Sequence, residues 1–306
     1  MKHTYLQPRV RNVALHISFC LLIAFVLSAC NSLNSSRALV FEPSNLPPLA
    51  NGFHYEGWAI VDNTPISTGK FNVDAEGDLV NLLGQKMSYF LPQENVQEVS
   101  SLVITIEPSG DTDDIPADTH ILAGDVRSGR AFLGIQHQAA LGTNFTGASG
   151  SYIFATPTTT ANDDELSGVW FLDPSTGTPR ASLNLPSLPV GWVYEAWAVI
   201  NGQALSTGRF RDVASADDFN GFSGPNVGPS FPGEDFISNA PNGLNFPTNL
   251  AGQTIVISVE PDADDSSAPF ILKPLVATSP SDAVAHQSYG LAQNLEFPSI
   301  EAVLLD

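Results

Sequence analysis

Two short acidic loops carry the residue types and spacing for cation chemistry. Each follows a Glu-Pro pair and contains Asp-x-Asp-Asp; the six aspartates are Asp111, Asp113, Asp114, Asp262, Asp264 and Asp265. Carboxylates at alternate loop positions can converge on one Ca²⁺ ion, although the glycine and the terminal glutamate of an EF-hand loop are missing. Two interpretations stay open, a weak Ca²⁺ site and an acidic turn exposed to water. No other cofactor is expected.

The N-terminal segment ends at a cysteine whose surroundings predict lipid chemistry. Basic residues precede an apolar stretch that closes on Leu27-Ser28-Ala29-Cys30. This arrangement is typical of a signal peptide, and its last four residues match the bacterial lipobox. We expect cleavage after residue 29, a palmitate-type lipid on Cys30 and attachment to a membrane of the bacterial cell envelope. Asn31, where an aspartate would favour the inner membrane, favours the outer membrane, on its periplasmic or surface-facing side.

Residues 214–247 form an insertion rich in Gly, Pro, Asn and Phe. It interrupts only one of two repeated sequences, and long insertions of this kind often carry ligand sites. Its possible binding residues are Phe231, Glu234, Asp235 and Phe236. A glycosidase-type hydrolase built here would need two facing carboxylates, and the sequence marks no such pair.

Other chemistry-bearing motifs are missing from the sequence. It contains no HExxH, P-loop, GxGxxG or GxSxG pattern. Four histidines follow the signal peptide, and none is spaced as a metal pair: His54, His120, His137 and His286. The formal net charge is −20, with 12 Lys+Arg against 32 Asp+Glu, which argues against a nucleic acid partner. We therefore expect a protein that is not an enzyme.

The sequence segments that would position these residues occur twice in the chain. Tyr55–Phe71 and Tyr194–Phe210 are identical at eight of seventeen positions, and Leu102–Pro108 matches Ile255–Pro261. The runs are short, apolar and partly alternating, as in β-strands, and Asn201-Gly202 is a strong hairpin signal. The sequence predicts an all-β chain with two antiparallel β-sandwich domains related by internal duplication.

The repeat also predicts the domain boundaries. We expect a signal peptide at 1–29, a tether at 30–46, a first sandwich at 47–184 and a second at 185–306, which carries the insertion. Strand-like residues 150–185 are expected to complete the first sandwich. The one expected helix is short, at residues 92–101, where Pro92 suits a first helical turn.

This strand pattern resembles the extracytoplasmic C-terminal domain of anti-sigma-K factors of the RskA type. The resemblance implies a β-sandwich and structural roles for the motif residues Tyr55, Trp58, Gly69, Phe71, Glu107, Pro108, Tyr194, Trp197, Gly208, Phe210, Glu260 and Pro261. From the residues themselves, the two tryptophans fit either core positions or carbohydrate platforms. The two glutamates are expected to accept hydrogen bonds from a neighbouring hairpin.

The resemblance is incomplete in two respects. Family members usually carry paired glycines after Glu-Pro, whereas this chain has Gly110 and an acidic loop. They also carry a cytoplasmic, zinc-binding, sigma-binding domain, and the sequence contains no such motif. The resemblance therefore implies the fold and a role in envelope sensing, and not sigma-factor inhibition by this chain.

The expected function is non-catalytic binding or sensing in the cell envelope. The expected partners are the membrane, through the lipid on Cys30, and an unknown envelope protein or glycan. Two alternatives stay open, a Ca²⁺-dependent adhesion or glycan-binding module and a hydrolase built around the insertion.

Overall fold

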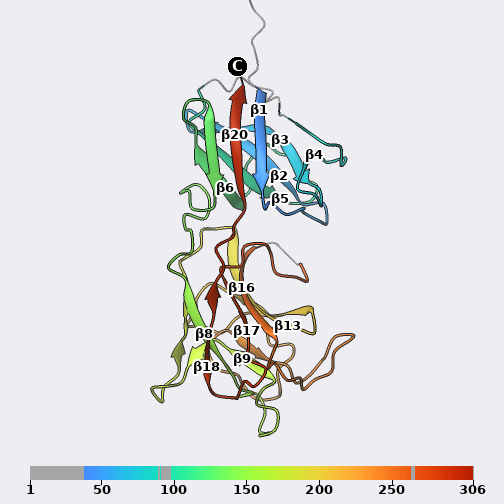
Figure 1. The fold of residues 1–306 in the computed structure, drawn as a ribbon, viewed down its shortest axis with the longest axis vertical. Coiled ribbons are helices and arrows are strands. Elements are labelled where there is room, and N and C mark those ends of the chain that lie inside the picture. The colour runs from blue at the N-terminus through green and yellow to red at the C-terminus, as the bar shows by residue number, and fades with distance from the viewer. Residues whose placement is uncertain (1–37, 89, 91–97, 263–265, 306) are drawn as a thin grey trace, which may run out of the picture.

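Alternating and β-branched sequences produce antiparallel sheets throughout the computed structural model, which describes residues 38–88, 90, 98–262 and 266–305. Within these ranges the secondary structure consists of strands, without a helix. The all-β, antiparallel fold expected from the sequence is confirmed. The strands form two lobes stacked along the long axis of the molecule (Figure 1).

The first lobe is built from one eight-stranded sheet. In sheet order its strands are β1 (Ala38–Ser44), β20 (Ser299–Leu305), β7 (Arg130–Gly134), β6 (His120–Asp125), β5 (Ser101–Glu107), β2 (His54–Val61), β3 (Thr64–Val73) and β4 (Leu79–Val80). Strands β1 and β3 lie near opposite edges of this sheet. The sheet curls, so that Phe41 of β1 packs against Phe71 of β3 with ring centroids 6.0 Å apart. Phe90 lies between them, 4.8 Å from Phe41 and 5.3 Å from Phe71.

The second lobe contains the remaining sheets. One five-stranded sheet consists of β14 (Gln203–Phe210), β13 (Trp192–Ile200), β16 (Thr254–Pro261), β17 (Leu275–Thr278) and β19 (Ala292–Gln293). The other contains β12 (Leu183–Asn184), β8 (Ser149–Phe154), β9 (Gly168–Trp170) and β15 (Gly233–Asp235), with β18 (Ser288–Gly290) also paired to β8. A small ribbon is formed by β10 (Leu172–Asp173) and β11 (Arg180–Ala181).

Two hairpins form at the turns that the sequence marks. Asp62 and Asn63, between β2 and β3, both have positive φ, at 49° and 62°. Asn201 and Gly202, between β13 and β14, have φ of 53° and 84°. Positive φ at both central residues is the signature of the type I′ turn, whose twist matches that of the flanking strands.

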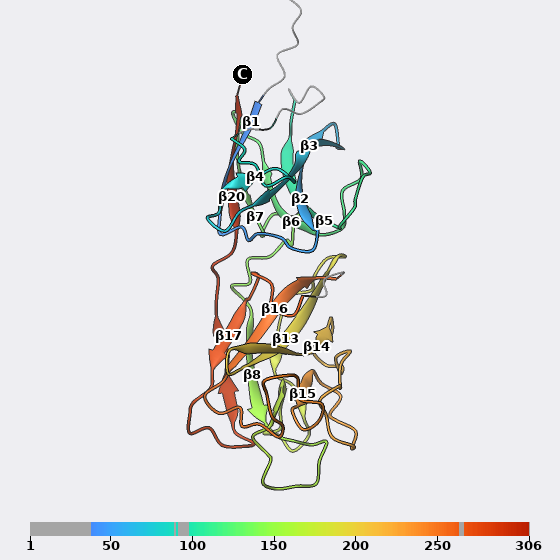
Figure 2. The same ribbon diagram turned by 90° about the vertical axis from the view of Figure 1, so that its right-hand side faces the viewer.

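Sheet membership departs from the expected domain boundaries. Strands β8 to β12, residues 149–184, belong to the second lobe, because β8 pairs with β18 and β9 pairs with β15. Near its other end the chain returns from the second lobe to the first. Its last strand, β20, pairs there with β1 and β7 (Figure 2). These strands have no counterpart in the repeated sequence, so local patterns do not indicate their partners.

The expected tether and helix also differ from what the structure describes. Residues 38–44 of the expected tether form β1, whose Leu39 and Phe41 point into the core, 1% and 3% exposed. Residues 92–97 of the expected helix lie outside the described residues, residues 98–100 are not helical, and Ser101 begins β5. The expected signal peptide and Cys30 also lie outside them.

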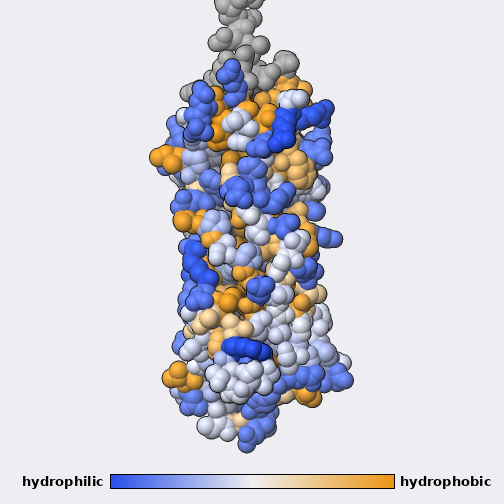
Figure 3. All heavy atoms as spheres, turned by 90° about the vertical axis from the view of Figure 1, so that its left-hand side faces the viewer, coloured by the Kyte–Doolittle hydropathy of each residue, from blue (hydrophilic) through white to orange (hydrophobic). Residues whose placement is uncertain are grey.

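On the face of the molecule shown in Figure 3, hydrophobic residues appear as small separate patches among hydrophilic ones. Scattered patches of this size are ordinary for a folded domain. The part of the chain that the structure describes holds no helix with the length and hydropathy needed to cross a bilayer.

Candidate binding pocket in the insertion

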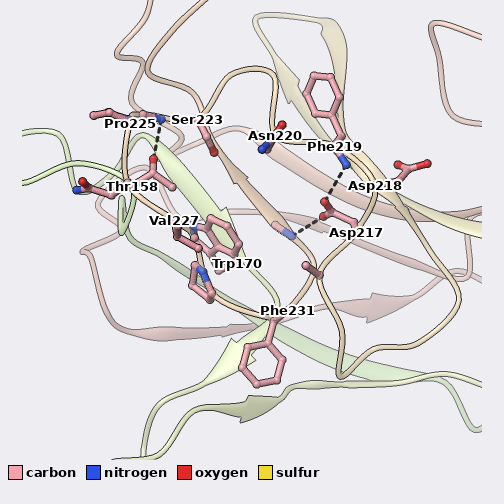
Figure 4. Close-up of a pocket in the computed structure, with 16 residues that line it drawn as sticks. Thr158, Trp170, Asp217, Asp218, Phe219, Asn220, Ser223, Pro225, Val227 and Phe231 are labelled. Carbon is pink, nitrogen blue, oxygen red and sulfur yellow. Dashed lines mark hydrogen bonds between the residues drawn. The ribbon is translucent and has the colours of Figure 1, made fainter.

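The insertion lines a pocket of about 490 Å³ in the second lobe. Residues 216–233 approach β9 and the turn at Thr158, and Figure 4 shows Trp170 between Thr158 and Asp217. Its lining mixes aromatic and polar side chains, among them Trp170, Phe219, Phe231, Asp217, Asp218 and Asn220. None of the described residues that line it is Lys, Arg or His. The pocket therefore suits a neutral or cationic ligand better than an anion.

Asp235 fastens the insertion to the rest of the lobe. The carboxylate is wholly buried and accepts hydrogen bonds from the Trp170 indole N–H at 2.7 Å and the Thr158 backbone N–H at 2.8 Å. It also accepts one from the Thr158 hydroxyl, whose oxygen accepts from the Gly224 N–H at 2.7 Å. Burial raises the pKa of Asp235, and these donors partly oppose the shift. Asp235 thus holds three chain segments around the pocket.

Glu234 performs a similar task inside the insertion. Its side chain accepts hydrogen bonds from the Ser223 hydroxyl, from the Phe222 N–H at 3.3 Å and from the Asp235 N–H at 2.9 Å. Glu234 is 0% exposed, and burial raises its pKa to about 7. The carboxyl group therefore shapes the loop beside the pocket and does not line it.

Asp217 is one of the two carboxyl groups that the insertion presents to the pocket, beside Asp218. It accepts hydrogen bonds from the Gly233 N–H at 2.8 Å and the Phe219 N–H at 3.3 Å. Burial, with smaller contributions from the charges of Glu234 and Asp218, raises its pKa to about 7. At neutral pH the group is thus divided between a hydrogen-bond-donating acid and a carboxylate.

Two glycines allow this close approach. A Cβ on Gly208, whose φ is +130°, would lie 2.4 Å from the Asp217 carboxyl carbon. A Cβ on Gly228 would lie 2.7 Å from the Trp170 indole ring. Side chains at these positions would displace Asp217 or the insertion backbone, so the pocket requires glycine at both.

A cluster of phenylalanine rings within the insertion stabilises its conformation. Phe222 contacts Phe219, Phe236 and Phe246 with ring centroids 5.1, 5.8 and 5.5 Å apart. Phe236 is 0% exposed, whereas Phe219 is 36% exposed at the pocket. The cluster fixes a partly exposed ring beside polar groups, an arrangement typical of surfaces that bind the apolar face of a sugar.

The four predicted binding residues of the insertion divide into two groups. Phe231 lines the pocket, whereas Glu234, Asp235 and Phe236 are 0% exposed. Acidic and aromatic residues in a Gly- and Pro-rich insertion look like contact residues in sequence. In the structure these three satisfy backbone N–H groups or pack in the core, because a long loop has its own polar groups to pair.

Trp170 and Thr158 of the pocket were not among the residues predicted from the sequence. Both come from the segment before the second repeat and reach the insertion through Asp235. Asp217 was also not among the predicted binding residues, and its one sequence signal is the acidic pair that it forms with Asp218 inside the insertion.

Among the described residues, the aspartates of the predicted calcium loops do not gather into a common site. Asp111 pairs with Lys70 at 2.7 Å, and Asp262 pairs with Arg211 at 2.7 Å. Asp113 is exposed and accepts a hydrogen bond from the Ile115 N–H at 2.9 Å, and Asp114 is exposed. Asp264 and Asp265 lie outside the described residues. Calcium binding at these loops stays a prediction.

The predicted motif tryptophans make equivalent hydrogen bonds in the two lobes. The Trp58 and Trp197 indoles each donate at 2.8 Å, to the hydroxyls of Thr105 and Ser258. Both tryptophans are 1% exposed, so they occupy core positions. The remaining members are Tyr55, Gly69, Phe71, Glu107 and Pro108 in the first lobe and Tyr194, Gly208, Phe210, Glu260 and Pro261 in the second.

Equivalent hydrogen bonds involve the tyrosines and the glutamates before proline. The Tyr55 hydroxyl donates to the Pro47 carbonyl at 2.8 Å, and the Tyr194 hydroxyl donates to the Pro186 carbonyl at 2.6 Å. Glu107 accepts from the Ala117 N–H at 3.0 Å, and Glu260 accepts from the Phe270 N–H at 2.8 Å. These groups fasten the edges of the repeated strands.

No family model, curated protein or solved structure matches the chain. The likeness to anti-sigma-K factor domains stays a prediction from the motif residues.

Proposed function

We propose that this chain is a lipid-anchored protein of the bacterial cell envelope that binds a saccharide without transforming it. The observation that carries the proposal is the pocket in the insertion. Its lining combines the exposed ring of Phe219 with Asp217, Asp218 and Asn220. Aromatic faces pack against the C–H face of a sugar, and carboxyl and amide groups pair with its hydroxyls.

The states of the acidic groups favour binding over hydrolysis. Inverting and retaining glycosidases place two carboxyl groups on opposite sides of the scissile bond. Glu234 and Asp235 are wholly buried and hold backbone and side-chain donors. Asp218 is engaged by Arg209, which approaches its carboxylate at 3.1 Å. Asp217 is thus the carboxyl group best placed for a ligand, and one such group supports recognition.

The position of the pocket fits presentation away from a membrane. The described chain begins at Ala38, at the outer end of the first lobe, and the insertion belongs to the second lobe (Figures 1 and 2). With the lipid on Cys30, the first lobe would lie between the membrane and the pocket. The likeness to anti-sigma-K factor domains supports the same extracytoplasmic place.

Replacement of Phe219 by alanine tests the pocket. We expect saccharide affinity to fall about fivefold or more, because an aromatic packing contact contributes about 1 kcal/mol. The measurement is calorimetric titration with the neutral oligosaccharide that gives the strongest signal on a glycan array. Phe132→Ala, at a ring 57% exposed on β7 of the first lobe, is the matched control and should leave affinity unchanged. Equal loss in the two variants, or no array signal for the wild-type chain, would refute the proposal.

Replacement of Cys30 by serine tests the anchor. Because the thiol is the lipid acceptor, the variant should leave the membrane fraction and appear in the soluble envelope fraction. Fractionation with and without detergent measures this. A variant that still needs detergent for extraction would show that something other than the Cys30 lipid holds the protein.

A further inference from the structure

Three potential metal ligands meet at the edge of the first lobe, away from the insertion. His54 and Glu56 lie two residues apart on β2, so their side chains share a face of the strand. Asp111 reaches them from the loop after β5. One ring nitrogen of His54 and one carboxylate oxygen each of Glu56 and Asp111 lie within 4.8 Å of one another.

Two of these groups are buried, since His54 is 4% exposed and Glu56 is 1% exposed. His54 Nε2 has no hydrogen-bond partner, and Glu56 Oε2 accepts no hydrogen bond and has the Lys70 ammonium 3.5 Å away. Their other polar atoms are engaged, since His54 Nδ1 lies 3.4 Å from the Gly52 carbonyl and Glu56 Oε1 accepts from the Ser67 hydroxyl. A buried polar atom without a partner costs about 1–3 kcal/mol, so an arrangement of this kind calls for a ligand.

The contact of His54 through Nδ1 leaves Nε2 available to a metal ion. A neutral imidazole that donates from Nδ1 to a backbone carbonyl carries its lone pair on Nε2. Metal-binding histidines are commonly fixed in this way by a carbonyl or carboxylate on the second nitrogen. The Gly52 carbonyl supplies that contact here.

A cation already neutralises part of the cluster. The Lys70 ammonium lies 2.7 Å from Asp111 Oδ2 and 3.5 Å from Glu56 Oε2. Burial lowers the pKa of Lys70, but the hydrogen bond to Asp111 and the charges of Glu56 and Asp111 outweigh burial and raise it overall. Its side chain is 24% exposed, so the flexible stem has a path to water.

We propose that His54, Glu56 and Asp111 bind a first-row divalent cation of the Zn²⁺ type, which displaces the Lys70 ammonium. One imidazole nitrogen and two carboxylate oxygens form a donor set suited to Zn²⁺, with a fourth position left for water. Ca²⁺ takes oxygen ligands and gains little from imidazole.

The second lobe supplies a natural comparison. Its Glu195 and Asp262 stand where Glu56 and Asp111 stand, and Arg209 stands where Lys70 stands. Val193, which pairs with Glu260 as His54 pairs with Glu107, replaces the histidine. The proposed site therefore belongs to the first lobe, and His54→Val makes that lobe resemble the second.

Zn²⁺ titration by calorimetry tests the proposal. The chain is used without its signal peptide and with Cys30→Ser, which removes the remaining thiol. We expect one Zn²⁺ per chain, at least tenfold weaker binding in His54→Val, and at least tenfold tighter binding in Lys70→Met because the competing ammonium is gone. His137→Ala, at a histidine beside Asp125, is the matched control and should bind as the parent does.

Three results would overturn the proposal. The first is equal Zn²⁺ affinity in the parent and His54→Val. The second is a Lys70→Met variant that binds Zn²⁺ no more tightly than the parent, which includes the case in which neither protein binds Zn²⁺. The third is Ca²⁺ competing for the site as well as Zn²⁺ does. Circular dichroism of each variant confirms that a lost signal does not come from a lost fold.

Discussion

Replacement of Ile300 by aspartate should unfold the first lobe or destabilise the chain by about 4 kcal/mol or more, because it buries a charge without a partner. Ile300 is 0% exposed in β20, where it pairs with Pro43 of β1 and Leu133 of β7. Disruption of β20 would separate β1 from the rest of its sheet. Chemical denaturation followed by circular dichroism measures the loss.

Glu301→Asp is the control for this substitution. Glu301 is the next residue of β20 and its side chain is exposed, so the conservative change should leave the midpoint of unfolding nearly unchanged. β7 ends at Gly134 and β20 begins at Ser299, so the whole second lobe lies between two paired strands in sequence. We therefore expect the two lobes to unfold together in the parent. An Ile300→Asp variant with the parent midpoint would contradict the placement of β20.

Raising the pH from 5 to 8 should destabilise the folded chain by about 3–5 kcal/mol through two carboxyl groups of the insertion, Asp217 and Glu234. The pKa values of Asp217 and Glu234 are each raised to about 7 in the folded protein by burial. The folded state therefore binds more protons than the unfolded state between about pH 4 and pH 7. Stability contributed by these protons is present at pH 5 and is lost as the pH rises through 7.

The groups around this pair set the controls. Asp218 and Asp235 add negative charge near Asp217 and Glu234, and Asp235 also has a pKa raised by burial. The double variant Asp217→Asn, Glu234→Gln should flatten the profile between pH 5 and 8. Asp173, whose pKa is lowered to about 2 by hydrogen bonds with Ser175 and Arg180, acts only at lower pH, so Asp173→Asn should keep the parent slope. A parent protein equally stable at pH 5 and pH 8 would show that the insertion is not buried as described.

Local sequence patterns predicted much of the fold because hairpins are decided by neighbouring residues. Asp62-Asn63 and Asn201-Gly202 favour positive φ, and each joins two strands that contain the repeated residues. The sequence left Trp58 and Trp197 open between core positions and carbohydrate platforms, and their burial in the structure decides for the core. Antiparallel pairing between adjacent strands then follows with little further information.

Pairings between distant segments were not predictable in this way. The segment at residues 38–44 is short and follows a polar segment. It forms a strand because it pairs with β20, which lies at the far end of the chain in sequence. The pocket combines Thr158 and Trp170 with an insertion more than forty residues later, through the buried Asp235. His54, Glu56 and Asp111 similarly meet through folding, since no regular spacing connects them.

The indole N–H signals of the four tryptophans test whether the insertion pocket is the ligand-binding site. Trp170 lines the pocket and donates its indole N–H to Asp235, whereas Trp58, Trp192 and Trp197 are at most 1% exposed in the cores. In ¹⁵N-correlated NMR spectra, titration with the best oligosaccharide from the array should shift the Trp170 indole signal and leave the other three in place. A saturating titration that leaves the Trp170 signal unchanged, or shifts the core indole signals instead, would show that the oligosaccharide does not bind in the insertion pocket.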